Sequence, residues 1–172
     1  MGETSPMLGA IVITDAGPLI HLDELDALAV LADFEQILVP DAVWREVEHH
    51  RPAALQGGAA VLLRQASPPA SQIVDALTSM FTLHLGEKEA LICCLSHPDS
   101  LLLTDDTAAR MAAKNLGLKA HGTVGLLIRA IRRQLRTKTE VLQLLADIPQ
   151  RSTLHIRPAF LATVIREVNE RS

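Results

Sequence analysis

The ten residues Leu101–Arg110 read LLLTDDTAAR, and this stretch sets the fold class. Its apolar start is typical of a short buried strand, and helical spacing begins again at Thr107. Two adjacent carboxylates, Asp105 and Asp106, stand between the two, with no Lys or Arg before Arg110. An ionised carboxylate costs several kcal/mol to bury unless a positive group pairs with it. The pair is therefore either a solvated turn with a helix cap, or half of a site for a cation.

Similar apolar runs alternate with segments of helical spacing along the chain. We expect strands at Ala10–Thr14, Gln36–Val39, Leu101–Thr104 and Leu118–His121. We expect helices at 22–31, 41–49, 71–80, 87–95, 107–116, 123–136, 139–146 and 158–169, whereas residues 53–70 show no clear element. This alternation predicts an α/β fold with a central parallel sheet of about four or five strands flanked by helices.

Length and composition limit the functions that the chain can have. Its 172 residues predict a single domain over 1–172, with a core at about 9–133 and C-terminal helices at about 139–170. The three Phe, one Trp and no Tyr argue against base stacking as a binding mode. A net charge of −4 excludes a generally basic nucleic-acid-binding surface but leaves room for a local patch.

Cysteine usage and hydropathy bear on the compartment. Cys93 and Cys94 are adjacent, so they suit neither a structural disulfide nor a zinc site and are expected to be reduced core thiols. The N-terminal stretch lacks the basic region of a signal peptide, and no apolar run reaches the ~18 residues that span a bilayer. We therefore expect a soluble cytoplasmic protein with no membrane partner.

Three of the acidic residues follow strands. Asp15 comes after the first predicted strand, and Asp105 and Asp106 come after the third. The carboxyl ends of parallel strands meet at one edge of a sheet, where ligands bind. If these strands are neighbours, ~4.8 Å apart, the carboxylates lie within reach of one ion.

Two further acids are placed by helix geometry. In LGEKEALICCL, Glu87 shares a face with Ala90 and Leu91, so it heads an apolar stripe that faces the core, whereas Glu89 lies on another face. In VWREVEHH, Glu46 shares a side with apolar residues three and four positions before it. We expect Glu87 and Glu46 to point inward.

Each acid also has a simpler interpretation. The aspartates could cap the turns or helices that follow them, Glu87 could favour a helix N-terminus, and Glu46 could be solvated. Taken singly, the simpler interpretation is favoured. Taken together, acids from four segments with no basic residue between them would repel one another unless a hard cation such as Mg²⁺ or Mn²⁺ neutralised them.

Four segments carry a resemblance to a known family: IVITDAGPLI, VPDAVWREV, LGEKEALICCL and LLLTDDTAARMAAKNLGLKAHGTVGLL. In order and spacing, over about residues 9–133, the chain resembles the PIN-domain nucleases and looks most similar to a small prokaryotic branch akin to the VapC toxins. The resemblance implies a metal-dependent endoribonuclease that leaves a 5′-phosphate and a 3′-hydroxyl. It also implies the toxin of a toxin–antitoxin pair, with RNA as substrate, an antitoxin protein as partner and a homodimeric assembly.

Residue by residue, the resemblance implies a catalytic quartet of Asp15, Glu46, Glu87 and Asp106. It implies that Mg²⁺ or Mn²⁺ is held by Asp15, Glu87, Asp105 and Asp106, and that Thr104 is a polar support. The chain departs from the family at two positions. Glu87 replaces a more frequent Asp, and Gly17 stands where a Ser or Asn side chain is frequent, so both an active and an inactive protein fit.

Four arginines form a basic stripe on one predicted helix, and two functions other than a nuclease also fit parts of the sequence. Arg129, Arg132, Arg133 and Arg136 fall on one side of a predicted helix and could bind RNA phosphates or form a solvated face. A catalytically inactive PIN-like binding module fits the same motifs. A receiver-like signalling domain fits less well, because it expects paired acids after the first strand and a Lys late in the sheet.

Overall fold

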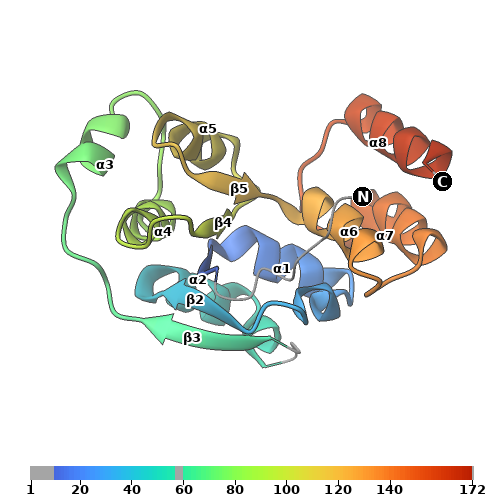
Figure 1. Ribbon diagram of the computed structural model, residues 1–172, viewed down its shortest axis with the longest axis horizontal. Coiled ribbons are helices and arrows are strands. Elements are labelled where there is room, and N and C mark those ends of the chain that lie inside the picture. The colour runs from blue at the N-terminus through green and yellow to red at the C-terminus, as the bar shows by residue number, and fades with distance from the viewer. Residues whose placement is uncertain (1–9, 57–59, 172) are drawn as a thin grey trace.

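The structure, a computed structural model, describes residues 10–56 and 60–171. At its centre lies a five-stranded sheet in which every neighbouring pair is parallel (Figure 1). The strands are β1 (Val12–Thr14), β2 (Gln36–Pro40), β3 (Val61–Gln65), β4 (Leu101–Leu103) and β5 (Lys119–His121), in the order β3-β2-β1-β4-β5. The predicted fold class is confirmed.

Helices cover both faces of this sheet. They are α1 (Ala16–Glu24), α2 (Asp41–His50), α3 (Gln72–Leu77), α4 (Leu85–Leu95), α5 (Thr107–Asn115), α6 (Thr123–Arg132), α7 (Lys138–Arg151) and α8 (Pro158–Glu170), with 3-10 helices η1 (Leu28–Leu31) and η2 (Pro52–Leu55). In the described part of the chain, no helix is long and apolar enough to cross a membrane.

The sheet divides the core into two layers. Val12 and Leu101 belong to a cluster with the apolar side chains of α1, α6 and α7. Ile13 and Leu102, the next residues along the same strands, belong to a cluster with α4 and α5. This alternation follows from the two-residue period of a strand, and it explains why β4 and the first two residues of β1 are apolar.

The strand order reverses between β1 and β4. From β1 the chain moves outward to β2 and β3, and it then returns to the other side of β1 for β4 and β5. The backbone N–H of Asp15 donates to the carbonyl of Leu103 over 2.8 Å, so the pairing continues to the ends of both strands. Open α/β sheets form a ligand crevice at such a switch point, beyond the carboxyl ends of the strands.

The helix after β1 differs from the prediction. We expected a helix over 22–31, but α1 begins at Ala16 and ends at Glu24, and residues 28–31 form the separate η1. Gly and Pro often end regular secondary structure, and Gly17 and Pro18 stand in this segment. They stand in the first turn of α1, where backbone N–H groups have no partner within the helix. Pro18 has no N–H to donate, so at this position it costs the helix no hydrogen bond.

Two other expectations are corrected. Residues 61–65 form β3, within a region where we expected no clear element. This strand pairs with β2 alone and is largely exposed, so its apolar residues lack the alternation of a half-buried strand. The predicted helix over 123–136 ends at Arg132, and Gln134 adopts a φ of 58°, which ends the helical path.

The expectation of core thiols is confirmed. Cys93 and Cys94 are both buried on α4 and form no disulfide. Burial raises the pKa of the Cys93 thiol to about 11 and that of Cys94 to about 12. Both side chains therefore stay protonated at neutral pH and act as small apolar groups.

Candidate active site

A pocket of about 310 Å³ opens at the carboxyl ends of β1 and β4. Five carboxylates and three imidazoles line it, and no Lys or Arg among residues 10–56 and 60–171 does so. The lining includes Asp15, Glu46, Glu87, Asp105, Asp106, His21, His84 and His155. The structure thus brings every acid singled out in the sequence to one concave surface at the switch point of the sheet.

Asp15 is the most buried of these acids. Its residue is 6% exposed. Its Oδ1 accepts a hydrogen bond of 2.8 Å from the backbone N–H of Ala16, and its Oδ2 accepts one of 3.0 Å from the Thr104 hydroxyl. Burial raises the pKa of Asp15 to about 7, and the charges of Glu87 and Glu46 act in the same direction. Asp15 therefore carries a proton for part of the time at neutral pH.

Glu87 and Glu46 approach Asp15 from two helices. Glu87 is buried, its Oε2 accepts a hydrogen bond of 2.6 Å from the backbone N–H of His84, and burial raises its pKa. Glu46, which we expected to point inward, is exposed on α2, although it lines the pocket. A Cβ built on Gly86 would lie 3.3 Å from Oε2 of Glu46 and 3.7 Å from Oδ1 of Asp15. Gly86 therefore allows the start of α4 to pass close to both carboxylates.

The two adjacent aspartates have different surroundings. Oδ1 of Asp106 caps α5 by accepting a hydrogen bond of 2.8 Å from the Ala109 N–H. Asp105 is held from two other helices: its Oδ2 lies 2.7 Å from Nδ1 of His21, and it accepts hydrogen bonds of 2.6 Å from both the N–H and the hydroxyl of Thr123. Asp106 is thus the less constrained carboxylate of the pair.

These acids cap helices and also share one pocket, so the two interpretations of the sequence are compatible. Asp15, Glu87 and Asp106 each accept a hydrogen bond at the start of a helix, and all three still line the pocket. The caps fix where each carboxylate stands. Thr104 joins two of them, because its hydroxyl donates to Asp15 and accepts a bond of 3.2 Å from the Asp106 N–H.

Comparison with known proteins identifies the family. A family model described as a PIN domain, DUF3368, matches residues 11–170, which is nearly the whole chain. The chain belongs to the PIN-domain family. PIN domains are generally nucleases that typically use divalent metals, so membership indicates a nuclease-type function acting on nucleic acid. Searches of curated proteins and of solved structures returned no significant match.

In this PIN domain, several pocket residues were not singled out from the sequence. His21 and Thr123 hold Asp105, and the segment 153–155 between α7 and α8 forms a wall. Once α1 is known to begin at Ala16, His21 falls one turn after Gly17 on the same helix face, which is a usable signal. The wall had no such signal, because it comes from a loop about 140 positions after Asp15.

The position of Glu89 on α4 also differs from the prediction. We expected it on another face than the inward-facing Glu87, but it is buried as well, with 6% of its surface exposed. Its Oε2 accepts a hydrogen bond of 2.8 Å from the backbone N–H of Ala42. It thereby caps the start of α2, where Pro40 offers no capping side chain, and a carboxylate at a helix N-terminus is favourable. Glu89 thus positions the helix that carries Glu46.

The structure divides the basic stripe predicted on α6, because two of its four arginines pair with Asp33. Both terminal nitrogens of Arg129 donate to Asp33 over 2.7 Å, and Nε of Arg133 donates to the same carboxylate over 2.8 Å. Partial burial acts to raise the pKa of Asp33, but the two guanidinium groups outweigh it and hold the pKa below its usual value. Arg132 is exposed, and Arg136 lies beyond the end of the helix.

The donor set of the acidic pocket fits a hard divalent cation in charge and in chemistry. Carboxylate oxygens are the ligands that Mg²⁺ and Mn²⁺ prefer, and the charges of Glu87, Glu46 and Asp106 oppose ionisation of their neighbours. Within residues 10–56 and 60–171, no three His, Cys, Asp or Glu side chains already stand close enough together to hold a metal ion. The pocket therefore matches a divalent cation in the type of its donor atoms and in its charge, but its side chains do not already form a coordination shell.

Proposed function

We propose that this PIN domain is an endoribonuclease that requires Mg²⁺ or Mn²⁺ and hydrolyses RNA phosphodiester bonds in the acidic pocket. One observation carries the proposal: carboxylates from four segments of the chain line a single pocket, and no Lys or Arg that the structure describes lines it. Such a cluster is costly without a cation, and it lies at the switch point where α/β sheets bind ligands. Membership of a family of nucleases supports the same conclusion.

Asp15, Glu46, Glu87 and Asp106 would hold the ion, with Asp105 beside them. The bound ion would lower the pKa of a water molecule and neutralise charge on the phosphoryl oxygens. Asp105 also has a structural role, because its hydrogen bonds to His21 and Thr123 connect it to α1 and α6. Thr104 keeps Asp15 and Asp106 at a set separation through its single hydroxyl.

The carboxylates also handle protons. In the metal-free protein the pKa of Asp15 is raised to about 7, so binding of a cation by this carboxylate would release a proton at neutral pH. In the described part of the chain, none of the Ser or Cys residues lines the pocket, and the two Cys thiols are buried elsewhere. We therefore propose direct attack by water on phosphorus, giving a 5′-phosphate and a 3′-hydroxyl.

The test is cleavage of end-labelled RNA by the purified protein with added Mn²⁺. Asp15→Asn, Glu87→Gln and Glu46→Gln are expected to lose most of the activity. Asp75→Asn on α3 and Glu48→Gln on α2 are matched controls, because both residues are exposed and lie outside the pocket. Cleavage that survives EDTA, or equal loss in the controls, would refute the proposal. Tight metal binding without cleavage would instead favour an inactive binding module.

The resemblance to VapC toxins extends the proposal to a biological role. We propose that the protein is a toxin that is inhibited by an antitoxin and that it assembles as a homodimer. Induced expression of the wild type, but not of Asp15→Asn, should then arrest growth. A small neighbouring reading frame should relieve the arrest. Growth that is unaffected by an active enzyme would remove the toxin role and leave the ribonuclease.

A further inference from the structure

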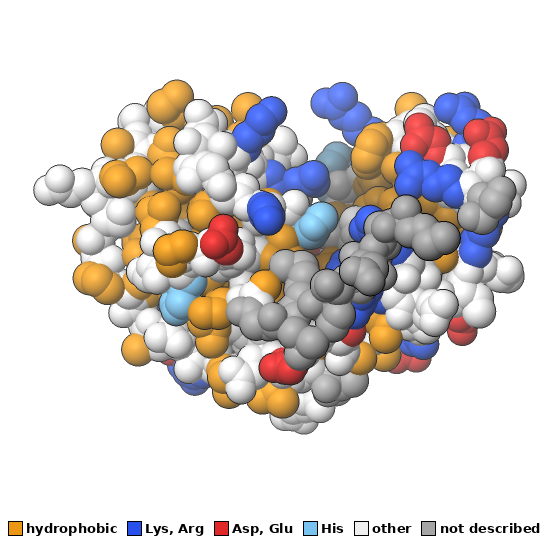
Figure 2. Space-filling model, in the orientation of Figure 1, with side chains coloured by type: hydrophobic (Ala, Val, Ile, Leu, Met, Phe, Trp, Pro, Cys, Tyr) orange, Lys and Arg blue, Asp and Glu red, His pale blue; other side chains and the backbone are white. Residues whose placement is uncertain are grey.

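A second groove, of about 580 Å³, adjoins the acidic pocket. The two share Asp105, Leu154 and His155, so their surfaces are continuous. One side of the groove comes from α5, β5 and the start of α6, and the other from the segment between α7 and α8 and the start of α8. Figure 2 shows a hollow between the α5 and α8 sides of the molecule, with Lys and Arg side chains gathered around it.

The groove differs from the acidic pocket in charge. Arg110 and Arg157 line it, both are exposed, and neither forms an ion pair with any residue that the structure describes. His121 also lines the groove, and the nearby positive charges affect its pKa. Burial lowers its pKa, and the positive charges of Arg129, Arg132 and Arg110 act in the same direction. The groove is therefore positively charged, whereas the adjoining acidic pocket is negatively charged.

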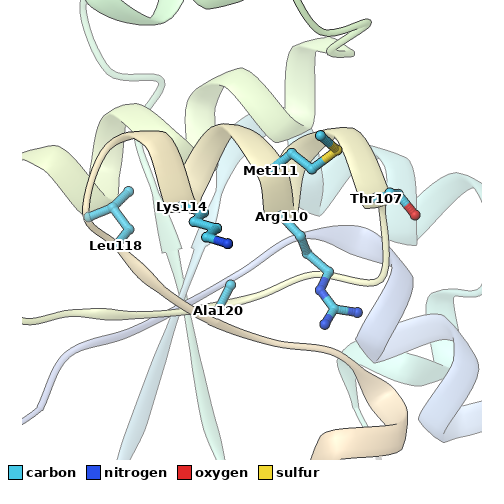
Figure 3. A pocket seen from close by; sticks show the side chains of 6 residues that line it. All are labelled: Thr107, Arg110, Met111, Lys114, Leu118 and Ala120. Atoms are coloured by element: carbon cyan, nitrogen blue, oxygen red, sulfur yellow. The ribbon is translucent and has the colours of Figure 1, made fainter.

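Arg110 stands at the boundary between the two. A Cβ built on Gly122 would lie 2.7 Å from Oδ1 of Asp105 and 3.6 Å from Nη1 of Arg110. Figure 3 shows Arg110 pointing from α5 towards the β5 side, with Lys114 one turn further along the same helix. The guanidinium therefore lies within a few ångströms of the carboxylate that links the two compartments, and Gly122 leaves the room for this approach.

An apolar wall faces these cations. Phe160 lines the groove and is 55% exposed, together with Val124, Ile128 and Val164. Of the four Phe and Trp residues of the chain, all within the described ranges, Phe160 is the one with an exposed side chain. The low aromatic content had argued against base stacking, but one aromatic ring stands where a base could stack.

We propose that this groove binds single-stranded nucleic acid beside the scissile bond, with Arg110 and Arg157 contacting phosphates and Phe160 stacking on a base. The proposal rests on the proposed function, which places the scissile phosphate in the acidic pocket. Unpaired guanidinium groups match phosphates in charge and geometry. Stacking on Phe160 requires an unpaired base, which a duplex does not offer.

The first experiment measures phosphate contact. Binding of a short fluorescent single-stranded RNA is followed between about 50 mM and 200 mM salt, in an Asp15→Asn background that prevents cleavage. Arg110→Gln/Arg157→Gln should lower the slope of log Kd against log salt by about 1.4, since each contact to a single strand contributes about 0.7. Arg166→Gln/Arg171→Gln, which changes the net charge equally outside the groove, should leave the slope unchanged.

The second experiment separates stacking from charge. Phe160→Ala should weaken binding by on the order of tenfold without changing the salt slope, because stacking involves no counterion release. Phe160→Trp should restore the affinity. A duplex of the same sequence, and polyglutamate as an acidic chain without bases, should compete poorly. These readouts require that the melting temperature of each variant stays close to that of the background protein.

Three outcomes would overturn the groove proposal: an unchanged salt slope in Arg110→Gln/Arg157→Gln, equal losses in the control pair, or tighter binding of polyglutamate than of RNA. Cleavage by proteins that retain Asp15 separates this proposal from the proposed function. Groove-dependent binding without metal-dependent cleavage would refute the ribonuclease and support the groove. Metal-dependent cleavage whose KM is unchanged in the arginine variant would refute the groove alone.

Discussion

The Thr104 hydroxyl donates a hydrogen bond of 3.0 Å to Oδ2 of Asp15, which joins the carboxyl ends of two neighbouring strands across 89 positions of the chain. The same oxygen accepts a bond of 3.2 Å from the Asp106 N–H. One buried side chain therefore links the Asp15 carboxylate to the backbone of Asp106, and both residues would help to hold the proposed ion. This relationship depends on the parallel pairing of β1 with β4 and on the strand order that makes them neighbours.

Thr104→Val should impair both stability and metal activation. Valine keeps the volume but leaves the buried Oδ2 of Asp15 without its donor, which costs about 1–3 kcal/mol of folding free energy. Because the hydroxyl lowers the pKa of Asp15, its loss should raise that pKa further and weaken metal binding at neutral pH. Thr104→Ser, which keeps the hydroxyl, should restore metal-activated cleavage. Equal defects in both variants would assign Thr104 a packing role only.

Asp15 should contribute a loss of stability to the metal-free protein as the pH rises from about 4 to about 7. Folded Asp15 keeps its proton to about pH 7, whereas the unfolded chain releases it near 3.8, so the folded state binds more protons between these values. Asp15→Asn removes this dependence. The variant should therefore gain stability relative to the wild type as the pH rises, and chemical denaturation at about pH 5 and about pH 8 measures the gain. Asp75→Asn should show no such trend.

Asp33→Ala should destabilise the protein strongly. The carboxylate is shared by Arg129 and Arg133, and the ring of Phe34 lies 4.3 Å from the Arg129 guanidinium. Removing one partner of a largely buried pair leaves a charge without compensation and costs about 3–5 kcal/mol. Arg136→Gln should change the free energy of unfolding by less than about 0.5 kcal/mol. Similar unfolding curves for the two variants would contradict a structural role for Asp33.

Glu24 should hold the wall of the acidic pocket in place. Its carboxylate accepts hydrogen bonds from the N–H and the hydroxyl of Thr153, at 3.0 and 2.8 Å, and so ties the segment before α8 to α1. In Glu24→Ala the Thr153 amide should exchange its hydrogen faster, and KM for RNA should rise. Glu35→Ala, an exposed glutamate on another loop, is the control. Unchanged exchange at Thr153 would show that the wall is held by other contacts.

The strand ends were the predictable part of the site. Buried strands of a parallel sheet are apolar throughout, so an acid at the end of such a run stands out, and this placed Asp15, Asp105 and Asp106 at one edge. Helix spacing placed Glu87 at the core for the same reason. Residue type and local period carry this information, and neither depends on distant contacts.

Contacts between distant segments were not predictable. The Asp33–Arg129 pair spans 96 positions, and the Glu24–Thr153 bond spans 129. The sequence could therefore not show that two arginines of the expected stripe are neutralised, or that a late loop closes the acidic pocket. The spacing along α6 was correct up to Arg132, but the arginines pack against a partner that periodicity cannot reveal.

Thermal melting with and without Mn²⁺ tests the central claim, that the acidic pocket holds the metal, most directly. At a hundredfold excess over its Kd, an ion that binds only the folded state adds about 2.7 kcal/mol of stability. For a chain of this size that corresponds to a rise in Tm of roughly 5–10 °C. We predict this rise in the wild type and in Asp75→Asn, and its near-complete loss in Asp15→Asn and Glu87→Gln. An equal response to Mn²⁺ in all four proteins would contradict the account.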